Sequence, residues 1–125
     1  MSDTNITEVT INGVTYVRKD TITNAPAVVD GLEYAVVRTY SAGVFAGYVE
    51  KEDGEEVTLR NARRIWFWAG AATLSELANE GTSKPKECKF PAAVPTVRLK
   101  NAIEVIPASE KARKSIESVA VWSAK

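Results

Sequence analysis

The segment RNARRIWFWAG, residues 60–70, holds the densest set of side chains that could bind a ligand. It places three arginines and three aromatic rings within nine positions, from Arg60 to Trp68. A guanidinium group can hold a phosphate through two parallel hydrogen bonds, and an indole can stack on a nucleobase with about 1–3 kcal/mol. The combination predicts a surface for a flat anionic ligand or, equally, a protein interface, since Trp and Arg are also the favoured interface anchors.

If this segment is an extended strand, it has two distinct faces, because successive side chains point to opposite sides. Aliphatic or core-like residues share one parity: Val57, Leu59, Ile65 and Phe67. The other parity carries the cations and indoles: Arg60, Arg64, Trp66 and Trp68. We therefore expect guanidinium and indole groups on one exposed face. The alternative is that the tryptophans pack under a helix or in a subunit interface while the arginines pair with carboxylates.

Arg38 is a second candidate for anion binding, because it ends an apolar strand just before a turn. The turn, Ser41-Ala42-Gly43, could present backbone N–H groups as an anion nest. The alternative is a surface arginine before an ordinary turn.

Three cations near the start of the final helix form a third candidate: Lys111, Arg113 and Lys114. Positive charge there opposes the helix dipole, and a bound phosphate would offset it. The alternative is a solvated helix face on which Glu110 and Glu117 neutralise the cations.

Composition excludes several classes of function. Sixteen Lys and Arg balance sixteen Asp and Glu, which argues against coating DNA, RNA or an anionic membrane through bulk charge. The sequence has no histidine and a single cysteine, Cys88, so we expect no zinc site, Ser-His triad or Cys-His dyad. The acidic run 50–56 lacks the spacing of a calcium loop. We therefore expect no catalytic residues, no metal and no cofactor.

The 125 residues are the usual size of one domain. The first residues contain no basic stretch followed by an apolar one, so we expect no signal peptide. No apolar run approaches the roughly 18 residues that span a bilayer. These features predict a cytoplasmic protein without a membrane partner.

Turn signals and periodicity divide the chain into three parts: an N-terminal hairpin over 8–17, a connector over 18–31 and a core over 32–119. Asn12-Gly13 is a preferred two-residue hairpin turn, and the connector has room for a short edge strand. Strands are predicted over 32–40, over 44–49 and from residue 56, followed by a helix that Thr73 caps and Gly81 ends.

The remaining core elements follow a proline-containing loop over 82–95. A strand over 97–106, or two strands with a kink near Asn101, leads to a final helix over 109–119. The predicted fold class is α+β, a curled antiparallel sheet or small barrel with two short helices.

Residues 33–118 resemble a family of small phage and prophage proteins. The resemblance is carried by RTYSAGV at residue 38, RNARRIWFW at residue 60, and KFPAAV and NAIEVIP further on. The chain is similar in these blocks to the anti-Thoeris sponges, the type-one Thoeris anti-defence proteins. The N-terminal hairpin is an extra element relative to that family.

The resemblance implies a protein that binds a cyclic nucleotide immune signal without cleaving it. Family members hold a cyclic ADP-ribose isomer, and some hold cyclic di- or trinucleotides, at the subunit interfaces of oligomers. Function in the host bacterial cytoplasm and homo-oligomerisation are therefore expected here. The matching candidate contacts are Arg38, Arg63, Arg64, Trp66, Trp68, Phe90, Asn101 and Arg113. The alternative is a phage structural or protein-interaction module that binds no small ligand.

Overall fold

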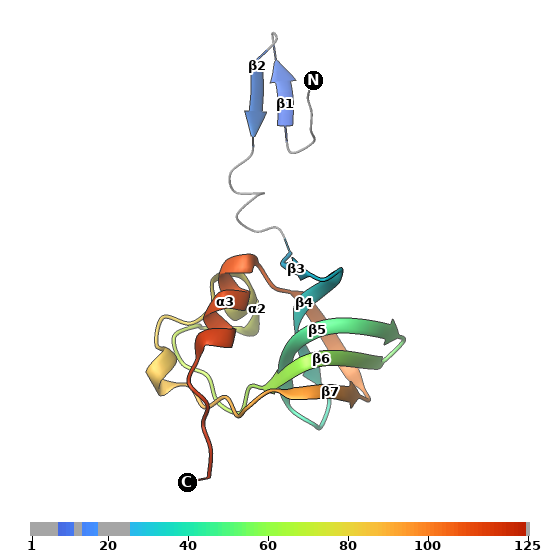
Figure 1. The fold of residues 1–125 in the computed structure, drawn as a ribbon, viewed down its shortest axis with the longest axis vertical. Helices are drawn as coiled ribbons and strands as arrows, with labels where there is room; N and C mark the ends of the chain where they lie inside the picture. Colours follow the sequence, from blue (N-terminus) through green and yellow to red (C-terminus); the bar gives the residue numbers. More distant parts are fainter. Residues whose placement is uncertain (1–7, 12–13, 18–25, 125) are drawn as a thin grey trace.

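The computed structural model describes residues 8–11, 14–17 and 26–124. At the N-terminus, β1 (Glu8–Ile11) and β2 (Val14–Val17) pair as an antiparallel hairpin, as predicted (Figure 1). The predicted Asn12-Gly13 turn and residues 18–25 of the connector lie outside the described residues.

The core is a six-stranded antiparallel sheet that curls without closing. Its strands are β3 (Val28–Val29), β4 (Leu32–Thr39), β5 (Val44–Asp53), β6 (Glu56–Arg64), β7 (Val94–Leu99) and β8 (Ala102–Pro107). The order is β3-β4-β5-β6-β7, and β8 pairs with β4 beyond the short β3. Residues 94–107 form two strands, β7 and β8, as one version of the prediction expected, and Asn101 lies between them with φ +56°. The predicted edge strand in the connector is β3.

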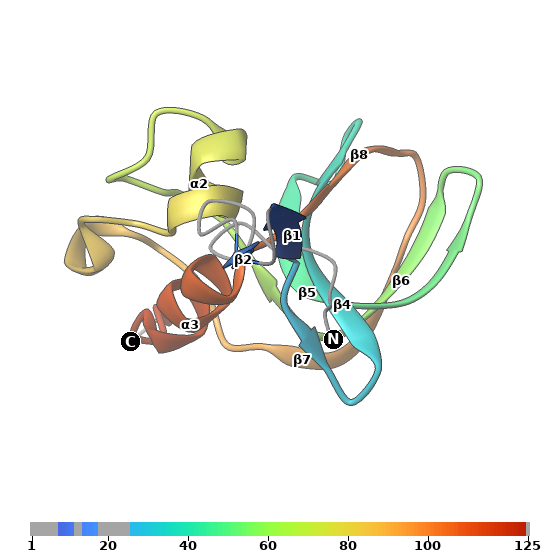
Figure 2. The ribbon, with the colours of Figure 1, turned by 90° about the horizontal axis from the view of Figure 1, so that it is seen from above.

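Both α-helices lie on the same side of the curled sheet (Figure 2). They are α2 (Leu74–Glu80) and α3 (Glu110–Ser118), and a short 3₁₀ helix, η1, spans Pro85–Glu87. Thr73 and Ser109 cap α2 and α3 with their side-chain oxygens, and Gly81 follows α2 with φ +77°. The α+β fold class and both predicted helices are confirmed.

Strand β4 lies between two hydrophobic cores, which explains its unbroken apolar run. Tyr34 and Val36 belong to the core between sheet and helices, whereas Ala35 and Val37 belong to the core inside the curl. Because alternate side chains face opposite sides, a strand buried on both faces cannot show the usual polar alternation.

The predicted parity along residues 57–68 is wrong, because β6 contains a bulge and ends at Arg64. The register with β5 shifts near Asn61, which has φ +50°. A Cβ on the opposing Gly47 would lie 3.0 Å from the Ala62 Cα, so the strands approach closely there. After the bulge the faces exchange. Ile65 consequently packs with the helices rather than with Val57 and Leu59.

Within the described part of the chain, no helix combines the length and the apolar character that crossing a membrane requires.

Candidate functional site

Arg63 is buried beneath α3, with only 5% of its surface exposed. Its guanidinium donates four hydrogen bonds of 2.6–3.0 Å to the carbonyl oxygens of Phe90, Pro91, Ile116 and Val119. Two of these carbonyls lie at the C-terminal end of α3, where the helix dipole favours a cation. Burial lowers the pKa of Arg63 from its ordinary value. The arginine joins the C-terminal segment to the sheet, and the prediction that it faces a ligand is wrong for this conformation.

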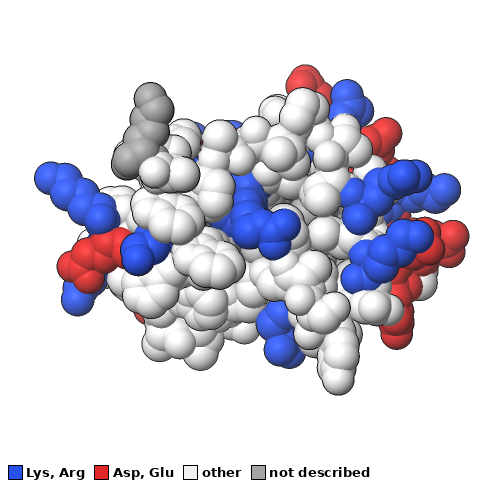
Figure 3. Space-filling model, turned by 90° about the horizontal axis from the view of Figure 1, so that it is seen from below, with Lys and Arg blue, Asp and Glu red and all other residues white. Residues whose placement is uncertain are grey.

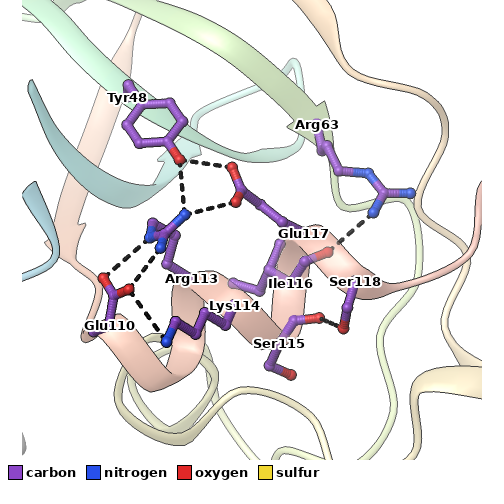
Figure 4. Close-up of polar contacts among 9 residues, drawn as sticks. All are labelled: Tyr48, Arg63, Glu110, Arg113, Lys114, Ser115, Ile116, Glu117 and Ser118. Atoms are coloured by element: carbon purple, nitrogen blue, oxygen red, sulfur yellow. Dashed lines mark hydrogen bonds and ion pairs between the residues drawn. The ribbon is translucent and has the colours of Figure 1, made fainter. Parts of the chain in front are cut away.

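Arg113 lies between two carboxylates of its own helix (Figure 4). Its Nε and Nη2 donate to the two carboxylate oxygens of Glu110 at 3.1 and 2.6 Å, and its Nη1 donates to Glu117 at 2.8 Å. The Tyr48 hydroxyl donates to Glu117 at 2.7 Å and accepts from Arg113 at 3.2 Å. The hydrogen bonds with Glu110 raise the pKa of Arg113 and lower the pKa of Glu110. Arg113 is thus neutralised within the protein, as the alternative reading of this helix expected.

The neighbouring cations of α3 are also paired. Lys111 donates to Glu80 at 2.8 Å, and Lys114 lies 3.8 Å from Glu110. Ser109 accepts the Ala112 N–H at 3.0 Å and so occupies the helix N-terminus with its own side chain. No described contact at this end supports the predicted phosphate site.

Polar groups in and beside the turn between β4 and β5 have partners within the protein. Arg38 donates to Glu104 at 3.1 Å, and both side chains are about half exposed. Within the predicted anion nest, the Ala42 N–H donates to the Thr39 hydroxyl at 2.8 Å and so is not free for an anion. The predicted contact Asn101 lies beside this turn, and its backbone carbonyl accepts the Tyr40 N–H at 2.9 Å.

Arg64 is exposed, unlike its neighbour Arg63. Its Nη1 donates to the Ala42 carbonyl at 2.7 Å, and its guanidinium carbon lies 4.4 Å from the centroid of the Phe45 ring. Among the residues that the structure describes, it forms no ion pair with a carboxylate. Arg64 remains a candidate for contact with an anion.

The aromatic candidates divide in the same way. Phe90 is fully buried in the core, and the half-buried Trp68 donates its indole N–H to the Ala71 carbonyl at 3.1 Å. Trp66 is 63% exposed. Of the predicted aromatic contacts, Trp66 alone presents most of its ring to solvent, and Phe90 cannot touch a ligand in this structure.

Trp66 belongs to an exposed aromatic cluster whose other members were not predicted as ligand contacts, and Phe67, predicted on the core-like face, is 50% exposed. The rings of Trp66 and Trp122 are nearly parallel, at 7°, with centroids 6.3 Å apart. The Lys89 ammonium lies 5.8 Å from the Phe67 centroid and 5.7 Å from the Trp122 centroid, within cation–π range. We call Trp66, Phe67, Lys89 and Trp122 the aromatic platform.

Two loops hold the platform in position. The backbones of Phe67 and Lys89 exchange hydrogen bonds of 3.3 and 2.8 Å. Further along, Gly70 adopts φ +84°, and a Cβ there would lie 2.5 Å from the Lys84 nitrogen and from the Thr82 hydroxyl. Only glycine allows this contact between the two loops, so the sequence WAG at 68–70 fixes the path of the platform loop.

Two hollows in the surface share Asn61 in their lining. One has a volume of about 510 Å³ and includes Tyr48 and Arg60 in its walls. The other, about 360 Å³, is lined in part by Arg63 and by Val121, the residue before Trp122 in the chain. In the described residues, no group of three or more Cys, Asp or Glu side chains is arranged to hold a metal ion.

Residues 32–116 match a family model described as a domain of unknown function, DUF6948. This match covers more than half of the chain, and the protein belongs to that family. No curated protein and no solved structure matched the chain.

Proposed function

We propose that this protein binds a cyclic nucleotide signal and holds it without cleaving it. In the setting that the resemblance to anti-Thoeris sponges implies, it acts as a phage anti-defence protein in the cytoplasm of an infected bacterium. The observation that supports this proposal most directly is the aromatic platform, on which two indoles and an ammonium group lie together at the surface.

The chemistry of the platform suits a nucleotide. A purine can stack on an exposed indole, and each such stack contributes about 1–3 kcal/mol. Lys89 lies among the rings and supplies a cation for a phosphate group, and Arg64 supplies a second exposed cation two residues before Trp66 in the sequence. The lack of histidine in the sequence supports binding rather than turnover, because histidine is the commonest general base.

Calorimetry with glyco-cyclic ADP-ribose tests the proposal. We expect saturable binding, followed by recovery of chemically intact ligand after the protein is denatured by heat. Trp66→Ala should weaken binding by at least fivefold, as the loss of one stack predicts. Val28→Ala is the matched control, because Val28 is as exposed, at 59%, but lies on another part of the sheet. No binding signal at high micromolar concentration, or recovery of a cleaved ligand, would refute the proposal.

A second function is favoured by the size of the exposed apolar surface. Trp66, Phe67, Val121 and Trp122 are all at least 42% exposed, and clusters of exposed aromatic residues are typical of protein interfaces. On this reading the platform contacts another protein or another copy of the chain. Native mass spectrometry separates the two functions: Trp66→Ala would then change the assembly and leave the affinity for any nucleotide unchanged.

A further inference from the structure

The platform is built on a short backbone ladder whose middle member is residues 89–90. On one side Phe67 bridges Lys89 in antiparallel fashion, and on the other Val121 bridges Phe90 in parallel fashion. The Trp122 N–H donates to the Phe90 carbonyl at 3.0 Å. The C-terminal segment and the Trp66 loop are therefore both held by the backbone of residues 89–90.

The alternating directions of neighbouring side chains at residues 89 and 90 explain why Lys89 lies among the rings. Phe90 points into the core and is fully buried, so its neighbour Lys89 points outward. Trp66 and Trp122 come from the two segments that flank residues 89–90, and their indole centroids lie 6.3 Å apart. Backbone contacts of Lys89 and Phe90 thus hold the two tryptophan segments side by side.

The platform carries one cation, Lys89, that lies against two aromatic rings. Lys89 forms no ion pair with a described carboxylate, whereas such pairs are made by Arg38, Arg60, Lys100, Lys111, Arg113 and Lys114. The C-terminal segment descends after α3 in Figure 1, and Figure 3 shows the molecule from that lower side. The middle of this face shows Lys and Arg without Asp or Glu, and charges of both signs occur toward its two ends.

We propose that Trp122 and Lys89 complete the ligand site: the purine stacks on the Trp66–Trp122 pair and the adjacent phosphate binds the Lys89 ammonium. This inference rests on the proposed function and adds two contacts that the family resemblance did not supply. Trp122 supplies π-surface and Lys89 supplies charge, so the site requires both a flat base and a phosphate.

A small nucleotide fits these features better than a nucleic-acid strand. Single-strand binding proteins follow the backbone with an extended positively charged groove, and their affinity depends strongly on salt. Here the formal net charge is zero, and the platform carries a single ammonium group. The geometry therefore suits one base with one neighbouring phosphate.

The test uses the full chain and three probes: glyco-cyclic ADP-ribose, AMP and adenosine. We compare the wild type with Trp122→Leu, which keeps an apolar side chain, and Trp122→Phe, which keeps an aromatic face. Lys89→Met keeps the apolar stem of the lysine and removes its charge. Indole N–H signals in NMR spectra report contact ring by ring, and half-buried Trp68 provides an internal reference.

We expect Trp122→Leu to weaken all three ligands by about 5- to 150-fold, the range for loss of one base stack, and Trp122→Phe to restore much of the affinity. Lys89→Met should weaken AMP and the cyclic ligand but leave adenosine unchanged. In wild-type spectra, the Trp66 and Trp122 signals should shift on titration and the Trp68 signal should not.

The outcomes separate this inference from the proposed function. Wild-type protein that binds none of the probes overturns both. Wild-type protein that binds the cyclic ligand, with Trp122→Leu and Lys89→Met equally tight, overturns the platform assignment and leaves sequestration standing. Tighter binding of a short single-stranded oligonucleotide than of any probe overturns the assignment in favour of a nucleic-acid partner. Equal loss of AMP and adenosine affinity in Lys89→Met shows a steric rather than an electrostatic role and overturns the phosphate contact.

Discussion

The contacts beneath α3 and the aromatic platform use the same kinds of side chain for different ends. Beneath α3, Arg63 and Arg113 are fully engaged by carbonyl and carboxylate oxygens of the protein itself. On the platform, Lys89 lies near ring faces, and Trp66 and Trp122 are 63% and 42% exposed. A cation that the fold already neutralises stabilises the fold, whereas one that the fold leaves unneutralised is available for a ligand.

Arg63 and Arg64 give the sharpest form of this comparison, because they are adjacent in sequence. Arg63→Ala should lower the free energy of unfolding by at least about 3 kcal/mol, since four carbonyl groups lose their donor in or near the core. Arg64→Ala should lower it by no more than about 1 kcal/mol, the range for an exposed cation–π contact. Urea unfolding of both variants measures the difference.

Arg63→Lys provides a further control, because it keeps the charge but has three donors on one atom instead of a planar fork. We expect stability between those of the wild type and Arg63→Ala. Equal stabilities for Arg63→Ala and Arg64→Ala would remove the distinction between an engaged and an open arginine.

Gly70 tests whether the platform depends on contact between its two loops. Gly70→Ala should destabilise the protein by about 2–3 kcal/mol, because φ is +84° and the new Cβ would meet the Lys84 backbone nitrogen at 2.5 Å. Gly54→Ala is the matched control: φ is +61° there, but nothing lies within 4 Å of the added Cβ. We expect about 1 kcal/mol for Gly54→Ala from backbone strain alone.

Thermal unfolding of the two glycine variants, compared with the wild type, measures both effects. Should Gly70→Ala be no more harmful than Gly54→Ala, the two loops are not held together as tightly as the structure indicates.

The order of the elements could be predicted from the sequence, because periodicity, caps and turns are local signals. Thr73, Gly81 and Ser109 marked the helix ends correctly, β4 was predicted over 32–40, and β8 falls within the stretch predicted as one strand or two over 97–106. The two faces of β6 were not predictable in this way. A bulge inserts one residue, and the inversion of every later side chain depends on how Gly47 packs against Ala62 across the sheet.

The candidate site was predicted only in part. Trp66 was identified from its neighbours in sequence, but Lys89 and Trp122 join it through a ladder between distant segments. No periodic pattern marks the residues after α3, so the sequence did not show which surface they cover. Arg63 was misassigned because the family resemblance placed it among the ligand contacts, and burial of an arginine by carbonyl oxygens depends on tertiary structure that the sequence does not show.

Tyr34 and Tyr48 make the next comparison, because their ring centroids lie 4.8 Å apart but, within the described part of the chain, only the Tyr48 hydroxyl has a hydrogen-bond partner. Tyr48→Phe should lower the free energy of unfolding by about 1–2 kcal/mol, because its hydroxyl donates to the Glu117 carboxylate at 2.7 Å. Tyr34→Phe should change it by less than about 0.5 kcal/mol at neutral pH, since the buried Tyr34 hydroxyl has no partner among the described residues. Chemical denaturation at pH 7 decides between these values, and a larger loss for Tyr34→Phe would mean that its hydroxyl has a partner.

The smallest effect concerns the pH dependence of the Arg113–Glu110 pair. The hydrogen bond from Arg113 lowers the pKa of Glu110 from its ordinary 4.5 in the folded protein. The unfolded chain therefore binds the proton first as the pH falls, so the pair stabilises the fold above the ordinary pKa and this contribution is lost at more acidic pH. Glu110→Gln should remove that part of the acid sensitivity.

The measurement is the free energy of unfolding of wild type and Glu110→Gln across the acidic range below about pH 5. Glu87→Gln serves as the control, because it removes one carboxylate of the short 3₁₀ helix without touching α3. We expect the difference between wild type and Glu110→Gln to shrink as the pH falls, because the folded-state pKa of Glu110 is lowered. A Glu110→Gln difference that does not vary with pH would mean that Arg113 is held in place by Glu117 and Tyr48 alone, and the polar network would then be smaller than the structure indicates.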